Sequence, residues 1–153
     1  MKKIFVPLHL WIKMMYGLKK RGQGKRESGG LLLSKQNENK VSKIVFYDQF
    51  DKTVSNSGII EFKGGIYLFD FLAKNKLEIL ADIHTHPTDN TSQSISDMEH
   101  PIVRIKGHIA IIAPNFAKNI FILPKHCSVY KFLGNFKWEK FSRKNNPIKI
   151  TLL

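Results

Sequence analysis

The chain has one cysteine, few acidic residues and no long apolar run. Cys127 alone cannot form an internal disulfide, so nothing calls for an oxidising compartment, and a cytoplasmic location is expected. No apolar stretch approaches the ~18–20 residues of a membrane span, so no membrane association is expected. The segment after Lys2 and Lys3 resembles a signal peptide. Because His9 and Lys13 interrupt it, we expect a strand and a helix there instead.

Because acidic residues are few, the chain has a strongly positive net charge. Against 25 Lys and Arg, 12 Asp and Glu give the 153 residues a formal net charge of +13. That charge fits an acidic partner or nucleic acid, but a lysine-rich solvated surface has the same composition. Because charge alone sets neither a structure nor a specificity, nucleic-acid binding is not the function we expect.

The apolar residues, 42% of the chain, predict one domain over residues 1–153 of the α/β class. We expect a mixed, mostly antiparallel sheet flanked by two main helices. The predicted helices are Leu8–Lys20 and Ile66–Lys76, with a short helical turn starting at Ser94. The predicted strands are Ile4–Pro7, Leu31–Leu33, Val41–Tyr47, Leu77–His84, His108–Ala113, Ile120–Leu123, Ser128–Leu133, Phe136–Phe141 and Ile148–Leu153.

The densest chemical signal is a pair of histidines followed by an aspartate. His84 and His86 are two residues apart, so a strand places both imidazoles on one side. Asp97 lies eleven residues later and can return to that side if the loop folds over. Two imidazoles and one carboxylate hold zinc with a fourth position left open, which is typical of a hydrolytic site.

Ser94 lies three residues before Asp97, on the same face of a helical turn. A zinc hydrolase needs a hydroxide at neutral pH, a carboxylate to move the proton, and a donor to the oxyanion. The Ser94 hydroxyl suits the last task. Ser-x-x-Asp is also a helix capping box, so both residues have a structural explanation as well.

This spaced motif resembles that of the JAMM (MPN+) metalloproteases, most closely the small bacterial JAB-type members. Glu27, in front of Ser28-Gly29-Gly30 and an apolar strand, stands where that family has its catalytic glutamate. The resemblance implies a JAB/MPN domain with one Zn²⁺ per chain on His84, His86 and Asp97. It implies that Glu27 is the general acid/base and that Ser94 stabilises the oxyanion. The glycines are expected to permit tight backbone conformations beside the site.

The resemblance further implies hydrolysis of an amide or isopeptide bond after the C-terminus of a ubiquitin-like protein or conjugate. Ubiquitin-ligase-like enzymes, including those of antiphage (CBASS-type) defence operons, are the implied partners. An extended tail would add to a sheet edge, and Ser55–Gly65 and Glu99–Gly107 are the expected flanks of its groove. Ile83 and Ser34 replace an aromatic residue and a glycine that are frequent in the family, which leaves the substrate open.

Two other functions compete with this one. Asp82-Ile83-His84-Thr85-His86 also resembles the opening motif of PHP-type phosphoesterases, but the 69 residues after His84 are too few for their barrel. An inactive MPN-type scaffold is the non-enzymatic alternative, and the complete set of motif residues argues against it.

Four further residues attract attention. Cys127 follows His126, but neighbours in a strand face opposite ways, so we expect an incidental thiol and not a nucleophile. His9, His100 and His108 have no partner recognisable in the sequence and are expected to be core or surface residues.

Overall fold

The computed structural model describes residues 2–51 and 64–153. The helices are α1 (Leu8–Gly22), α2 (Gly65–Asn75) and α3 (Ile95–Glu99). The strands are β1 (Ile4–Pro7), β2 (Gly29–Lys35), β3 (Lys43–Phe46), β4 (Leu77–Thr85), β5 (Ile109–Ala113), β6 (Ser128–Gly134), β7 (Lys137–Lys140) and β8 (Ile148–Thr151). Short 3-10 helices are η1 (Tyr47–Gln49), η3 (Asn115–Ala117), η4 (Pro124–His126) and η5 (Arg143–Asn145).

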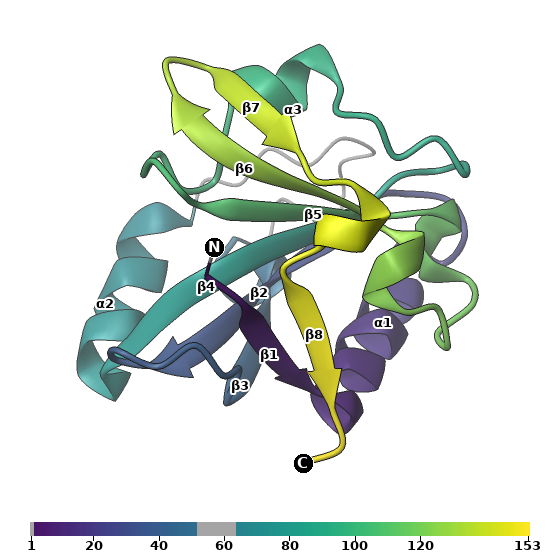
Figure 1. Ribbon diagram of the computed structural model, residues 1–153. Helices are drawn as coiled ribbons and strands as arrows, with labels where there is room; N and C mark the ends of the chain where they lie inside the picture. The colour runs from purple at the N-terminus through teal and green to yellow at the C-terminus, as the bar shows by residue number, and fades with distance from the viewer. Residues whose placement is uncertain (1, 52–63) are drawn as a thin grey trace.

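The centre of the fold is a six-stranded mixed sheet with the strand order β3-β2-β4-β5-β6-β7 (Figure 1). The one parallel pair among them is β4–β5, and the other neighbours are antiparallel. β1 and β8 form a separate parallel pair, with Ile4 opposite Ile148. The predicted fold class, a mostly antiparallel mixed sheet flanked by helices, is confirmed.

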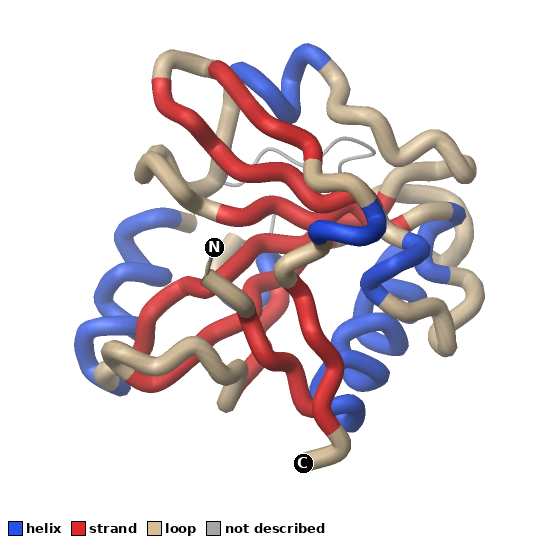
Figure 2. Tube along the Cα trace, viewed as in Figure 1, coloured by secondary structure: helices blue, strands red, loops and turns tan. Residues whose placement is uncertain are grey.

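Alternate residues of the central strands face two different cores. Leu32 packs with α1, β1 and β8 on one face of the sheet, whereas Leu31 and Leu33 pack with α2 on the other. Figure 2 shows α1 and α2 on opposite sides of the strands. Burial on both faces explains why this strand reads as a continuous apolar run and not as an alternating one.

The predicted strand at Ile120–Leu123 is wrong. Those residues form a turn, in which the Ile122 N–H donates to the Asn119 carbonyl, followed by η4. The apolar pattern has another cause. Ile120 and Ile122 pack against the α1 core, and Trp11 Nε1 donates to the Ile122 carbonyl at 2.8 Å.

The fold also bears on two further expectations, the phosphoesterase barrel and the groove segments. The barrel required by the phosphoesterase alternative does not form, because the described residues build an open sheet. Most of the predicted groove segment Ser55–Gly65 lies outside the described residues. Glu99–Gly107 connects α3 to β5. Among residues 2–51 and 64–153, no helix is both long and apolar enough to span a membrane.

Candidate metal centre

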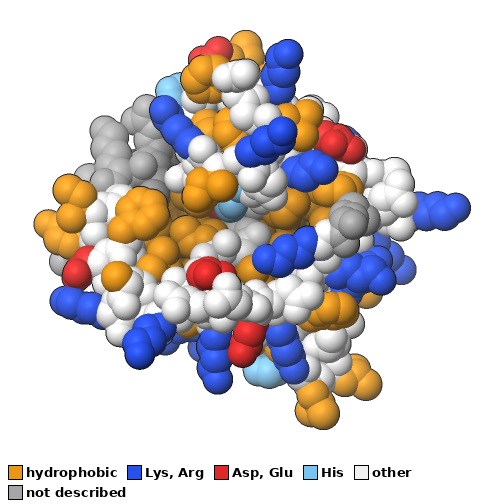
Figure 3. All heavy atoms as spheres, turned by 60° about the vertical axis from the view of Figure 1, so that its left-hand side comes forward, with side chains coloured by type: hydrophobic (Ala, Val, Ile, Leu, Met, Phe, Trp, Pro, Cys, Tyr) orange, Lys and Arg blue, Asp and Glu red, His pale blue; other side chains and the backbone are white. Residues whose placement is uncertain are grey.

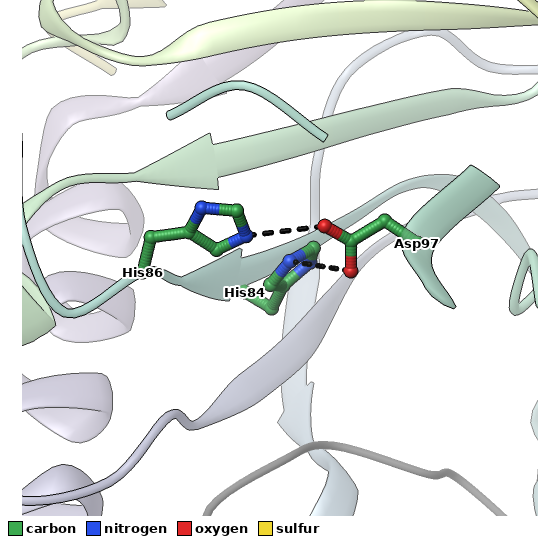
Figure 4. Close-up of side chains that lie close together, drawn as sticks. All are labelled: His84, His86 and Asp97. Carbon is green, nitrogen blue, oxygen red and sulfur yellow. Dashed lines mark hydrogen bonds and ion pairs between the residues drawn. The ribbon is translucent and has the colours of Figure 1, made fainter. Parts of the chain in front are cut away.

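His84 and His86 reach the same side of the sheet from the end of β4. His84 is in the strand and His86 follows its last residue, so the two-residue period of extended backbone aligns the rings. Their ring centroids are 5.1 Å apart. Figure 4 shows both rings turned toward the carboxylate of Asp97, which comes from α3. The structure therefore brings the three residues of the predicted metal set together.

The distances within this cluster are short. His84 Nε2 lies 3.3 Å from Asp97 Oδ1, and His86 Nε2 lies 3.1 Å from Asp97 Oδ2. One ligand atom from each residue lies within 4.8 Å of the others. The exposed fractions of the three side chains are 13%, 10% and 19%. A small cation could thus contact all three while remaining open to solvent on one side.

Asp97 is held in place by a capping box at the start of α3. The Asp97 N–H donates to Ser94 Oγ at 3.0 Å, and the Ser94 N–H donates to Asp97 Oδ2 at 2.8 Å. The capping interpretation of this motif is therefore correct, and it does not exclude a role at the metal. The same geometry points the carboxylate toward the histidines.

The ring of His86 is oriented by a backbone carbonyl. Its Nδ1 lies 3.1 Å from the carbonyl oxygen of Asn90, and a proton on Nδ1 leaves Nε2 as the atom that faces Asp97. Such a second contact is the usual way in which proteins fix a metal-binding imidazole. The sequence carries no signal for it, because any residue supplies a carbonyl.

The charges of the cluster perturb one another. Burial acts to raise the pKa of Asp97, but the facing imidazoles of His84 and His86 outweigh it and hold that pKa well below its usual value. The hydrogen bond with Asp97 raises the pKa of His86 above its ordinary value, against the effect of burial. The cluster is therefore an anionic carboxylate that faces imidazoles. A bound metal cation would take the place of the proton that the His86 imidazole holds in its absence.

The donor set fits zinc. Among the residues that the structure describes, buried His84 Nε2 has no well-aligned hydrogen-bond partner, although it lies 3.3 Å from Asp97 Oδ1. A buried acceptor without a donor is unfavourable, and a metal ion would satisfy it. His84, His86 and Asp97 are the residues that would hold the ion.

Glu27 lies in the connection between α1 and β2, beside the cluster. Burial raises the pKa of Glu27, the histidines His84 and His86 act to lower it, and Asp97 acts to raise it. Glu27 therefore interacts electrostatically with the three residues of the metal set. It also lines a hollow of about 190 Å³ with Arg21, Arg26 and Asp48, of which Arg21 and Asp48 form an ion pair at 2.9 Å.

The glycines after Glu27 have a different explanation from the one expected. Neither Gly29 nor Gly30 has a positive φ. A Cβ on Gly29 would lie 2.3 Å from the Tyr47 ring, and one on Gly30 would lie 2.6 Å from the Val45 carbonyl oxygen. These glycines provide space for close packing and not an unusual backbone conformation.

Aromatic residues that the sequence analysis did not single out hold the loop before α3. Tyr130 in β6 donates its hydroxyl proton to the Thr91 carbonyl at 3.0 Å. Trp138 in β7 donates from Nε1 to the Met98 carbonyl at 3.1 Å, and its ring packs on Phe132. The β6–β7 hairpin thereby fastens the segment that carries Asp97, a long-range contact with no local sequence pattern.

His108 is a buried histidine, within the expectation of a core or surface residue, and the structure supplies the partner that the sequence did not reveal. His108 Nε2 lies 2.6 Å from Asp82 Oδ2, and both side chains are buried. Asp82 is two residues before His84 and lines the same hollow as His84 and Asp97.

For Cys127, burial raises the pKa of the thiol to about 12, which agrees with an unreactive residue.

No protein-family model matches the sequence. Solved structures resemble it over nearly its whole length. Protein DSY2949 from Desulfitobacterium hafniense has 16% identity and a TM-score of 0.61, covering 97% of this chain and 92% of its own. AF2198, a JAB1/MPN domain protein from Archaeoglobus fulgidus, has 13% identity and a TM-score of 0.54, covering 97% and 98%.

A third similar structure is described as a metalloprotease-like JAMM zinc site in the proteasome and signalosome. It has 13% identity and a TM-score of 0.52, and covers 98% of this chain and 99% of its own. At these identities the likeness concerns the fold. The chain has the fold of JAB1/MPN domain proteins, and it places two histidines and an aspartate together in that fold.

Proposed function

We propose that the chain is a zinc-dependent peptidase of the JAMM type, which hydrolyses the amide or isopeptide bond after the C-terminus of a ubiquitin-like protein. The observation that carries this proposal is the cluster of His84, His86 and Asp97, whose ligand atoms lie within 4.8 Å of one another in a JAB1/MPN fold. The nearby Glu27 supplies the acid/base group that a metallopeptidase needs.

Each residue has a distinct task in this proposal. Zinc, when bound, would polarise the reacting groups as a Lewis acid and lower the pKa of water. Glu27 would accept a proton from the attacking water and return it to the leaving amine. Ser94 Oγ accepts the cap bond from the Asp97 N–H, so its own proton remains available to donate to the oxyanion.

The environment of Glu27 supports its role. A general base works best when its pKa is near the working pH. Burial moves the pKa of Glu27 upward, in that direction. Glu27 also lines a hollow, together with Ser28 and Gly29 among others.

The substrate and partners rest on the resemblance of the motif. A ubiquitin-like protein, free as a precursor or conjugated to another protein, is the proposed substrate. Ubiquitin-ligase-like enzymes are the proposed partners. The high positive charge of the chain suits a substrate with an acidic surface around its tail.

The test is cleavage of a ubiquitin-like protein fused through its C-terminus to a reporter peptide. Glu27→Gln should lower kcat/KM by roughly 100-fold or more, the usual contribution of a general base, and should still bind one zinc per chain. Glu38→Gln, an exposed glutamate in the β2–β3 turn, is the matched control and should cleave normally. Full activity in Glu27→Gln would contradict the mechanism. Absence of zinc after metal-replete purification would favour the non-catalytic scaffold.

A further inference from the structure

A further hollow, apart from the two described above, lies on the face of the sheet that carries β1. It has a volume of about 540 Å³, against about 40 Å³ for the hollow beside His84 and Asp97. It is bounded by the start of β1, by β4 and β5, by the loop 103–108, by the middle of β6 and by the end of β7. Figure 3 shows this side of the molecule, where hydrophobic side chains line a depression with lysines and arginines around it.

The walls of this hollow are apolar. The lining residues of this kind are Ile4, Ile79, Leu80, Val103, Ile105, Ile109 and Phe141. Three of them, Ile4, Leu80 and Ile109, also belong to the core around α1, so the walls are fixed by the packing of the fold. At the rim, Ile105 leaves 68% of its surface exposed. Covering such a side chain with an apolar ligand would be favourable.

The rim of the hollow is positively charged. Lys2, Lys106 and Lys131 line it together with one acidic residue, Glu139. Lys131 and Glu139 pair with each other at 3.6 Å. Within the part of the chain that the structure describes, Lys2 and Lys106 form no ion pair. Two lysines therefore leave their charge available next to an apolar surface.

This hollow is separate from the metal centre. The hollow beside His84 and Asp97 and this one have no lining residue in common among those that the structure describes. The buried Asp82–His108 pair lies between them, with Asp82 lining the first and His108 lining the second. A ligand in the second hollow would leave the metal set uncovered.

We propose that this hollow binds a small amphipathic anion, a molecule with one apolar chain or ring and one carboxylate. Its volume falls in the range of roughly 300–1,000 Å³ that is typical of small-molecule sites, which combine apolar walls with a few polar groups. The apolar part would lie against Ile4, Leu80 and Ile109. The carboxylate would lie between Lys2 and Lys106, whose ammonium groups bind anions as point charges.

Octanoate is a suitable probe, and NMR can locate it on a protein of 153 residues. Titration should give saturable shifts of backbone amides clustered at residues 79–80 and 103–109. The Lys2→Glu/Lys106→Glu double variant should bind at least tenfold more weakly. The matched Lys19→Glu/Lys20→Glu variant, with the same charge change at the exposed end of α1, should bind as the unaltered protein does. Octan-1-ol, which lacks the charge, should also bind at least tenfold more weakly.

Three outcomes would overturn the proposal. The first is shifts that do not saturate. The second is shifts that cluster on the exposed α2 residues Ile66, Tyr67 and Phe69. The third is equal affinity in both double variants. Because the readout is binding and not hydrolysis, these outcomes are independent of the proposed peptidase activity.

Discussion

Ser28 and Thr85 are joined by three hydrogen bonds across 57 positions of sequence, the longest of which runs from the Thr85 hydroxyl to the Ser28 carbonyl at 3.5 Å. The Ser28 N–H donates to Thr85 Oγ1 at 3.0 Å, and the Thr85 N–H donates to the Ser28 carbonyl at 2.9 Å. Ser28 follows Glu27, and Thr85 lies between His84 and His86. The Ser28 hydroxyl also donates to the Leu18 carbonyl at 2.8 Å. The proposed catalytic glutamate and the histidines are thus held on one framework.

Removing the Thr85 hydroxyl should weaken this framework. Thr85→Val keeps the shape of the side chain but leaves the buried Ser28 N–H without its acceptor, which costs about 1–3 kcal/mol. Chemical denaturation should show a loss of stability of that size. The Thr151→Val control removes a hydroxyl bonded near the exposed C-terminus and should have little effect. Equal stability of both variants would show that the bond contributes nothing.

The Trp138 hydrogen bond should matter for metal affinity. Trp138→Phe keeps an aromatic ring against Phe132 but removes the bond to the Met98 carbonyl, which contributes about 0.5–1.5 kcal/mol. Zinc affinity, measured by chelator competition, should fall by roughly two- to tenfold. Trp11→Phe loses a similar bond, to Ile122 in the α1 core, and should lower stability without weakening zinc binding. The same change in zinc affinity in both variants would refute a specific role for Trp138.

Protons should compete with zinc at His86. The hydrogen bond with Asp97 raises the pKa of His86 above its ordinary 6.5, so the metal-free ring keeps its proton to a higher pH than a free histidine. Since zinc binds the neutral imidazole, its affinity should fall as the pH decreases through that raised pKa. Calorimetry in two buffers should record proton release near neutral pH. A zinc affinity that stays constant between pH 8 and pH 6 would contradict this.

The proposed role of Glu27 predicts the acidic limb of the pH profile. A base must be deprotonated to act, and burial raises the pKa of Glu27 above its ordinary 4.5. The kcat/KM for fusion cleavage should therefore fall as the pH decreases through this raised value. Glu27→Gln should lose that limb along with most of its activity. If the residual activity of Glu27→Gln fell in the same way at low pH, the titrating group would be a residue other than Glu27.

Much of this arrangement could be predicted from local pattern. Two histidines spaced for a strand and a Ser-x-x-Asp turn depend on backbone geometry within a few residues, and the structure places them as expected. The predicted start of the strand after the β6–β7 turn, at Phe136, differs from the structure. Asn135 and Phe136 both have positive φ and close a tight hairpin, so β7 begins only at Lys137.

The remaining features depend on contacts distant in sequence. The Asp82–His108 pair joins β4 to the residue just before β5, across 26 positions of sequence. Ile120 and Ile122 pack against the α1 core from a turn, whose apolar composition is the same as that of a buried strand. The close approach of Tyr47 to Gly29 depends on how β2 packs beside η1. None of these contacts leaves a periodic pattern in the sequence.

Anomalous diffraction at the zinc edge, from crystals of the metal-replete protein, tests the central claim most directly. The account predicts one strong peak per chain. It should lie about 2.0–2.2 Å from Nε2 of His84, from Nε2 of His86 and from a carboxylate oxygen of Asp97. A map with no peak among these three residues, or with its zinc bound elsewhere on the chain, would contradict the assignment of this cluster as the metal centre.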